Sequence, residues 1–150
     1  MEINNKNRFI SPHQKVLEIL QSAWEGEREN AVYITKLIKL AKDPSDKEIL
    51  RLVYMDEHKH VKYFADIYKK LCGQTIQENV SISQRPSGWD LCLEFEKMIY
   101  KFIDNAEFYR RIHLGFTDNE IRDMLFEIIT DEMNMAIKMT HLSNKNRKFF

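Results

Sequence analysis

Apolar residues recur every three or four positions along most of the chain, which is the spacing of amphipathic helices. The first such stretch begins at Ser11-Pro12, where a capping serine precedes the proline that helices accept at their first position. Asp43-Pro44 ends this stretch and caps a second one, which runs to Gly73, a residue suited to ending a helix. The apolar positions of these two predicted helices are Val16, Leu20, Trp24, Ala31, Ile34, Ile38 and Ala41, then Val53, Phe64, Ile67 and Leu71.

The second half of the chain predicts two more helices. Ser87 opens the third helix and Gly115 closes it, while Thr117-Asp118-Asn119-Glu120 has the pattern of a capping box at the start of the fourth. No alternating pattern typical of a strand competes with these periods, so the fold class is all-α. The apolar positions are Leu91, Phe95, Met98, Phe102, Tyr109 and Ile112, then Ile121, Leu125, Ile128, Met135, Met139 and Leu142.

Residues 74–87 separate the two halves, hold no helical period and include Pro86. Such a segment can span roughly 46–50 Å when extended, whereas a helix of about 26 residues is about 39 Å long. It can therefore return along the bundle and start the third helix parallel to the second. We predict an antiparallel four-helix bundle with one long crossover between helices two and three. Residues 1–150 would form a single domain, with frayed tails at 1–10 and 144–150.

The two halves also resemble each other when the sequence is shifted by 75 residues. The shift aligns the turn between the first two helices with the turn between the last two, and it aligns the apolar stripes. Identical residues fall at Asn30-Ala31 and Asn105-Ala106, and at Asp56-Glu57 and Asp131-Glu132. We interpret the chain as two equivalent helical hairpins.

Composition excludes several classes of function. Lys plus Arg number 23 and so do Asp plus Glu, which gives a net charge of zero and no basic excess for binding nucleic acid. No run of about eighteen apolar residues predicts a membrane span, and residues 1–9 lack the apolar centre of a signal peptide. We expect a cytoplasmic protein without nucleic-acid or membrane partners, in which Cys72 and Cys92 are reduced and half-buried.

Four polar residues interrupt the apolar stripes. Glu27 falls on the inward face of the first helix, Glu57 and His60 on that of the second, and Glu132 on that of the fourth. Counted from the helix ends, all four lie near the middle of the bundle. An isolated buried carboxylate is costly, and no Lys or Arg shares these stripes. A divalent cation would neutralise the group, and oxygen with imidazole ligands suits iron, manganese or zinc.

These residues resemble a known family. Glu57-His58-Lys59-His60 is similar to the Glu-x-x-His element of ferritin-like, rubrerythrin-type di-iron carboxylate proteins, as is the surrounding VYMDEHKHVKYFADIYKKLCG. The stretch EFYRRIHLGFTDNEIRDMLFEIITDE resembles the second half of such proteins, and the resemblance covers about residues 14–142. It implies the ferritin-like form of the bundle, with a di-metal site that takes six ligands.

Carried over by position, the family pattern is incomplete. Glu27, Glu57, His60 and Glu132 match four ligands, but Phe102 stands where the third helix should give Glu. Met135 stands where the fourth helix should give His, and both losses fall on the same metal position. The resemblance therefore implies one ion rather than two, iron before manganese or zinc, with Glu27 and His60 as its terminal ligands. Two ions would need a surrogate ligand. Asn105, one turn beyond Phe102, is a predicted hydrogen-bond donor to a ligand.

Two functions follow from this pattern. The first is a ferritin-like, rubrerythrin-like metal-binding protein with weak or altered oxidoreductase activity, since half of the second metal position is missing. The second is a non-catalytic helical interaction module, with a homodimer allowed for, whose metal site is vestigial. In that case Glu27, Glu57, His60 and Glu132 would form a partly protonated hydrogen-bonded network without metal. No CxxC pair of a rubredoxin segment is present to deliver electrons.

Overall fold

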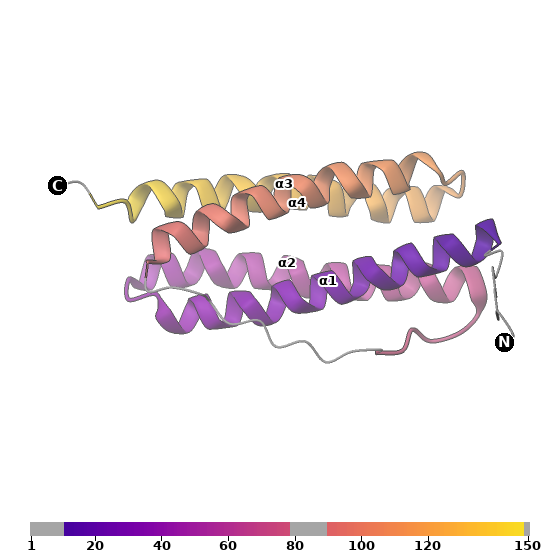
Figure 1. The fold of residues 1–150 in the computed structure, drawn as a ribbon, viewed down its shortest axis with the longest axis horizontal. Helices are drawn as coiled ribbons and strands as arrows, with labels where there is room; N and C mark the ends of the chain where they lie inside the picture. Colours follow the sequence, from indigo (N-terminus) through magenta and orange to yellow (C-terminus); the bar gives the residue numbers. More distant parts are fainter. Residues whose placement is uncertain (1–10, 79–89, 149–150) are drawn as a thin grey trace, which may run out of the picture.

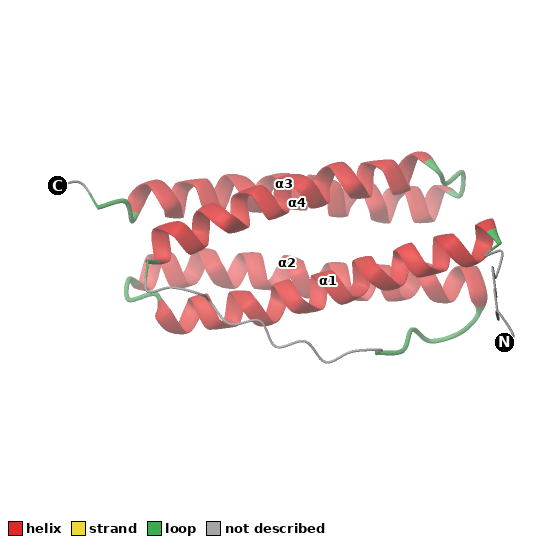
Figure 2. Ribbon diagram, in the orientation of Figure 1, coloured by secondary structure: helices red, strands yellow, loops and turns green. Residues whose placement is uncertain are grey.

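The computed structural model describes residues 11–78 and 90–148. Within these residues the chain forms four α-helices and no strands (Figure 2). The helices are α1 (Pro12–Leu40), α2 (Pro44–Cys72), α3 (Leu91–Leu114) and α4 (Asn119–Lys145). The predicted all-α four-helix bundle is confirmed. No helix of the described residues is both long enough and apolar enough to cross a bilayer.

The helix ends follow the local sequence. The Ser11 hydroxyl accepts from the Gln14 amide with Pro12 at the first position, and Asp43 with Pro44 does the same for α2. Gly73 ends α2 with a φ of 74°, a left-handed backbone that favours glycine. Among the described residues, Cys72 and Cys92 are free and half-buried.

Two predicted helix starts need correction. Ser87 lies outside the described residues, and the described helix begins at Leu91 with Asp90 as its cap. At α4 the cap is Asp118 rather than Thr117, because the Asp118 carboxylate accepts the Ile121 amide at 3.0 Å. A carboxylate is as good a cap as a hydroxyl, so either residue of the Thr-Asp pair could have filled this position.

The helices pair as two antiparallel hairpins. α1 packs along α2 and α3 along α4, and α2 also contacts α4. α2 and α3 run in the same direction, so the chain crosses the length of the bundle between them (Figure 1). This is the predicted one-crossover order. The crossover prediction covers residues 74–87, of which 79–87 lie outside the described residues.

The predicted tail at residues 144–150 is partly wrong. α4 continues to Lys145, and the Lys145 ammonium lies 2.8 Å from Asp43 and 2.6 Å from Asp46 at the start of α2. Asn146 also donates to Asp46 at 3.0 Å. Asp46 is buried, so this end of α4 is fixed by a charged contact between the two hairpins. The predicted tails at 1–10 and 149–150 lie outside the described residues.

Two apolar clusters fill the interior. One surrounds Leu50, Phe102 and Met135, and the other surrounds Leu20, Phe64 and Leu125. Each fully buried side chain of this size contributes roughly 1.5–3 kcal/mol of hydrophobic stabilisation. On α1, α2 and α4 the residues between the two clusters are the polar ones that interrupt the apolar stripes. The core therefore consists of an apolar layer, a polar layer and a second apolar layer.

Candidate metal centre

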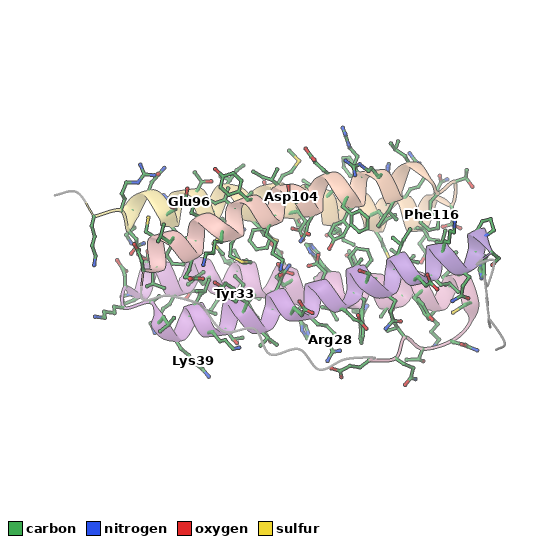
Figure 3. The ribbon with its side chains drawn as sticks, viewed as in Figure 1. Arg28, Tyr33, Lys39, Glu96, Asp104 and Phe116 are labelled. Carbon is green, nitrogen blue, oxygen red and sulfur yellow. The ribbon has the colours of Figure 1, made fainter. Side chains whose placement is uncertain are left out.

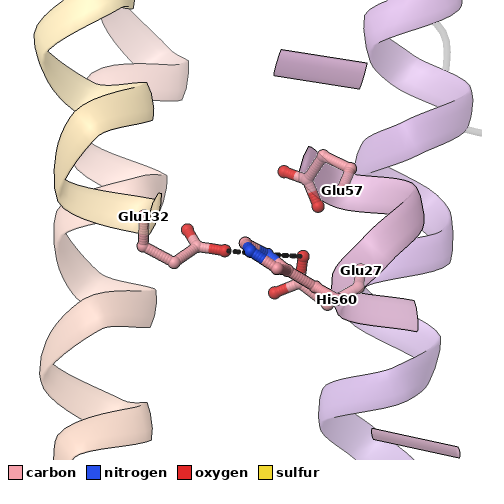
Figure 4. Close-up of side chains that lie close together, drawn as sticks. All are labelled: Glu27, Glu57, His60 and Glu132. Carbon is pink, nitrogen blue, oxygen red and sulfur yellow. Dashed lines mark ion pairs between the residues drawn. The ribbon is translucent and has the colours of Figure 1, made fainter. Parts of the chain in front are cut away.

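The four sequence-predicted ligands meet in the polar layer. Glu27 comes from α1, Glu57 and His60 from α2, and Glu132 from α4 (Figure 4). All four side chains are fully buried. One ligand atom of each lies within 4.8 Å of the corresponding atoms of the other three. Glu57 and His60 share this layer because residues three apart on a helix project from one face.

His60 connects the two hairpins through both of its ring nitrogens. Its Nδ1 lies 3.4 Å from Glu27 Oε2 and 3.4 Å from Glu132 Oε1. Its Nε2 lies 2.9 Å from Asp131 Oδ2, and Asp131 is in turn 2.8 Å from the Lys59 ammonium. Asp131 therefore fixes the orientation of the ring and leaves Nδ1 facing the carboxylates.

Helix α3 donates hydrogen bonds to Glu27 and Glu132, each at the carboxylate oxygen that does not face His60. The Tyr109 hydroxyl donates to Glu27 Oε1. The Asn105 amide donates to Glu132 Oε2 at 3.5 Å. Each of these carboxylates thus has one oxygen occupied by a donor from α3 and one oxygen directed at the cluster. Asn105 was predicted as such a donor, and this contact confirms it.

Unpaired polar atoms concentrate in this cluster. Among the described residues, six buried side-chain nitrogen or oxygen atoms lack a hydrogen bond, and five of them belong to the cluster. They are Glu27 Oε2, both carboxylate oxygens of Glu57, His60 Nδ1 and Glu132 Oε1. Leaving a buried polar atom without a partner costs about 1–3 kcal/mol each. These inward-facing oxygens and an imidazole nitrogen form a donor set that fits iron, manganese or zinc.

Proton binding offers these residues another way to reduce their charge. Burial and the neighbouring Glu27 charge raise the pKa of Glu57 well above its usual value. Burial and the same charge raise the pKa of Glu132. Burial alone would raise the pKa of Glu27, but Glu57, His60 and Tyr109 together lower it to about 2. The cluster therefore favours the protonated forms of Glu57 and Glu132 and the ionised form of Glu27.

The imidazole carries the matching positive charge. Burial alone would lower the pKa of His60, but its hydrogen bond with Asp131 and its ion pairs with Glu132 and Glu27 raise it to about 11. Without a metal the cluster is thus an imidazolium between ionised Glu27 and ionised Asp131. A cation that binds here must replace these protons.

The other half of the predicted di-metal site is apolar. Phe102 and Met135 are both fully buried and belong to one hydrophobic cluster, as predicted. Asp56 is the repeat counterpart of Asp131, but the position that matches His60 is Met135, which offers no ring nitrogen. Asp56 instead lies 3.7 Å from Lys59 and 3.9 Å from Lys138. The supporting carboxylate of the missing half is therefore still present, and it pairs with lysines.

Sequence reasoning missed two residues of this centre. Tyr109 was read as packing, but its hydroxyl is bound to Glu27. Asp131 was noted only as part of the repeated Asp-Glu pair, but its carboxylate fixes the ring of His60. The signal for Asp131 was in the repeat, since an acidic residue precedes Glu57 and Glu132 alike. Protonated His60 compensates the charge of Glu27, and Asp131 favours that protonated form while it pairs with Lys59.

Comparison of the chain with protein-family models, with curated proteins and with solved structures gave no match.

Proposed function

We propose that this protein binds a single divalent metal ion between its two hairpins, through Glu27, Glu57, His60 and Glu132. One observation carries the proposal. One ligand atom of each of these four buried side chains lies within 4.8 Å of the others, and five polar atoms of the four residues make no hydrogen bond. Protein interiors rarely leave such atoms without a hydrogen bond, and a cation would bind one ligand atom of each side chain. Carboxylate and imidazole donors suit iron, manganese and zinc. Iron is the preferred ion because the sequence resembles di-iron proteins.

The residues around the ligands have separate roles in this proposal. Asp131 holds His60 so that Nδ1 faces the carboxylates, and Tyr109 holds Glu27. Both are positioning residues. A bound iron would supply Lewis acidity and one-electron redox chemistry. Because the layers on either side are apolar, the protein itself would keep bulk water away from the ligands.

We further propose that the protein is related to ferritin-like, rubrerythrin-type proteins and that its oxidoreductase activity is weak or altered. The resemblance of the Glu-x-x-His helix and the one-crossover bundle support this relation. Phe102 and Met135 support the loss of activity, because two adjacent metals share the redox change in the complete family members. A cytoplasmic location remains part of this proposal.

The alternative function is a non-catalytic interaction module with a vestigial site. It is favoured by the closed set of charges that the residues form without metal, in which an imidazolium lies between two carboxylates. In this alternative Glu57 and Glu132 stay protonated, and the cluster is a buried polar network. Such networks can be retained without contributing net stability.

Metal content separates the two functions. Protein purified without added metal, then titrated with Fe²⁺, Mn²⁺ or Zn²⁺, should bind one equivalent and melt at a higher temperature, since a ligand selective for the folded state stabilises it. Glu57→Gln should abolish binding. Glu94→Gln is the matched control, because Glu94 is an equally buried glutamate that is bonded to Tyr33 outside the cluster. Unchanged melting of the wild-type protein with all three ions would refute the metal proposal.

A further inference from the structure

The outer side of the second hairpin presents apolar residues to solvent. Tyr100 and Ile103 on α3 are 63% and 43% exposed, and Met133 and Ile137 on α4 are 57% and 67% exposed. We call these four residues the outer patch. They are level with one another, because Asn105 of α3 bonds Glu132 of α4 in the middle of the hairpin. Large apolar side chains gathered on one exposed face mark an interaction surface more often than scattered ones do.

The repeat shows that this surface is particular to one hairpin. Shifted by 75 residues, the outer patch corresponds to Glu25, Arg28, His58 and Lys62 on the first hairpin. Those residues are polar or charged, and Arg28 lies 3.0 Å from Glu78. Arg28 and Lys39 lie along the outer edge of α1, away from the second hairpin (Figure 3). The two hairpins therefore differ at these four outer positions, which the core does not determine.

Exposed residues of α3, together with half-buried Glu96, repeat at alternating steps of three and four, which is the spacing of a helix-pairing seam. The order along this seam is Leu93, Glu96, Tyr100, Ile103, Glu107, Arg110 and Leu114. Reversing it about the point between Ile103 and Asp104 places Tyr100 opposite Glu107 and Ile103 opposite Asp104. Leu93 then falls opposite Leu114, and Glu96 falls opposite the neighbouring Arg110 and Arg111. Glu96, Arg110 and Arg111 make no ion pair within the part of the chain that the structure describes.

We propose that a second copy of this chain docks on the outer patch, with a two-fold axis lying across the helices. In this arrangement α3 packs antiparallel on α3 of the second copy, and α4 packs antiparallel on α4. The same axis passes α4 between Met133 and Asn134, so the two Met133 side chains meet at the centre. Glu96 of each copy then faces Arg110 and Arg111 of the other at the two ends of the contact, and its centre holds Tyr100 and Ile103 with the neighbouring Asp104 and Glu107.

This pattern of residues favours a second copy of the chain, bound as a two-fold dimer, as the partner of the outer patch. Closed two-fold dimers use one surface twice, so the surface must be complementary to itself. Binding of an unrelated partner would not require Leu93 and Leu114 to lie equally far from the point between Ile103 and Asp104. It would also not require Glu96 and the two arginines to lie at matching distances on opposite sides of that point. The outer α4 stripe contains no Asp, Glu, Lys or Arg, with Phe126, Thr130, Met133, Ile137 and His141 in order. It places no like charges against each other when reversed.

Sedimentation velocity of the full chain over a range of concentrations tests the dimer. The wild-type chain should sediment as a dimer, and Ile103→Glu should weaken the dimer by at least about tenfold, because it buries unpaired charge at the centre. Ile137→Lys tests the same contact from α4, and circular dichroism should show the same helix content for both variants. The control is Met55→Glu, since Met55 is 63% exposed on α2 and should leave the dimer unchanged. A wild-type chain that stays monomeric at the highest concentration overturns the proposal.

Charge reversal tests the two-fold arrangement itself. Glu96→Arg should weaken the dimer, and combining it with Arg110→Glu and Arg111→Glu should restore it. A combined variant that remains monomeric overturns the antiparallel pairing. The dimer does not depend on the metal centre, so Glu57→Gln should sediment as the wild type does. Failure of metal binding with an intact dimer, or the reverse, therefore separates the two proposals.

Discussion

Asp131 lies beside Glu132 on α4 but bonds across the bundle to His60, with 2.9 Å between its Oδ2 and Nε2 of the ring. This contact decides which nitrogen of His60 faces the cluster. Because Nε2 is occupied, Nδ1 is the only ring atom that can serve Glu27, Glu132 or a cation. Asp131 itself is held by Lys59 at 2.8 Å, near the surface. A partly exposed ion pair thus sets the orientation of a fully buried ligand.

Asp131→Asn should weaken metal binding by about 10–100-fold while leaving the chain folded, because the amide holds the ring less firmly and makes it less basic. Titration of the metal-free protein against a competing chelator measures the change. Asp56→Asn is the matched control, since Asp56 occupies the same place in the first hairpin but pairs with Lys59 and Lys138 instead of a histidine. Equal loss of affinity in both variants would show that Asp131 acts through general charge and not through His60.

Metal affinity should rise with pH. Burial raises the pKa of Glu57 and of Glu132 well above its usual value, and the pKa of His60 is raised to about 11 despite its burial, so the cluster favours the protonated form of all three in the absence of metal. Binding must release those protons, and the affinity falls as the proton concentration grows. Calorimetry in buffers with different ionisation enthalpies should detect more than one proton released per ion. A binding constant that is flat from mildly acidic to mildly alkaline pH would contradict this.

Stability of the metal-free protein should fall as pH rises. Glu57, Glu132 and His60 have raised pKa values in the folded state, so the folded chain binds more protons than the unfolded chain above their usual pKa values. The contribution of His60 is complete below its ordinary pKa of 6.5 and is lost as pH rises through about 11. For the two glutamates the loss begins above 4.5. Urea unfolding at several pH values measures this slope.

Glu57→Gln is the control for that slope. Glutamine mimics the protonated acid without titrating, so the variant should lose less stability on going to alkaline pH than the wild-type protein. The contribution of Glu27 to stability changes with pH in the opposite direction. Its pKa is lowered to about 2, so the contribution is lost only as pH falls from 4.5 through that value. Stability that increases towards alkaline pH would mean that Glu57 and Glu132 are ionised in the folded metal-free protein.

The buried ligands could be predicted from the sequence because each one interrupts a regular apolar stripe. Glu27, Glu57, His60 and Glu132 stand at core positions, and helical spacing alone places them inside. Their common height followed from counting along helices of known rise. Phe102 and Met135 were identified as core by the same period, and both are fully buried.

Asp131 and Tyr109 could not be assigned in the same way. Asp131 follows Thr130 at the edge of the stripe, and whether it reaches His60 depends on how α4 is rotated against α2. Tyr109 has the apolar body of a core residue, and spacing does not reveal whether its hydroxyl has a partner. Both roles depend on contacts between hairpins, which periodicity within one helix does not encode. The caps at Asp90 and Asp118 differ from prediction because several neighbouring residues could cap equally well.

Tyr109→Phe should destabilise the protein by about 1–3 kcal/mol, because it leaves the buried Glu27 oxygen without its donor. It should also lower metal affinity, since Glu27 loses the contact that orients it. Tyr33→Phe is the matched control, because Tyr33 is also buried and donates to a buried glutamate, Glu94. Chemical denaturation should show similar losses for both, and chelator competition should show weaker metal binding for Tyr109→Phe alone. Weaker binding in both would mean that general loosening of the bundle causes the effect.

The missing half of the predicted di-metal site can be rebuilt. Phe102→Glu with Met135→His should raise metal binding from one equivalent to two, because the repeat aligns these two positions with the ligands Glu27 and His60. Without metal the double variant should be less stable than the wild type by several kcal/mol, since it buries a carboxylate and an imidazole in an apolar cluster.

Added metal should recover much of that lost stability in the double variant, because binding to the folded state opposes unfolding. Phe102→Leu with Met135→Leu is the control: it keeps the core apolar, and it should hold one equivalent. Elemental analysis and thermal melting with and without Fe²⁺ or Mn²⁺ give both readouts. If the double variant still holds one ion, the backbone of α3 and α4 no longer matches that of α1 and α2 at this layer. In that case the loss of the second metal position is not explained by the Phe102 and Met135 side chains alone.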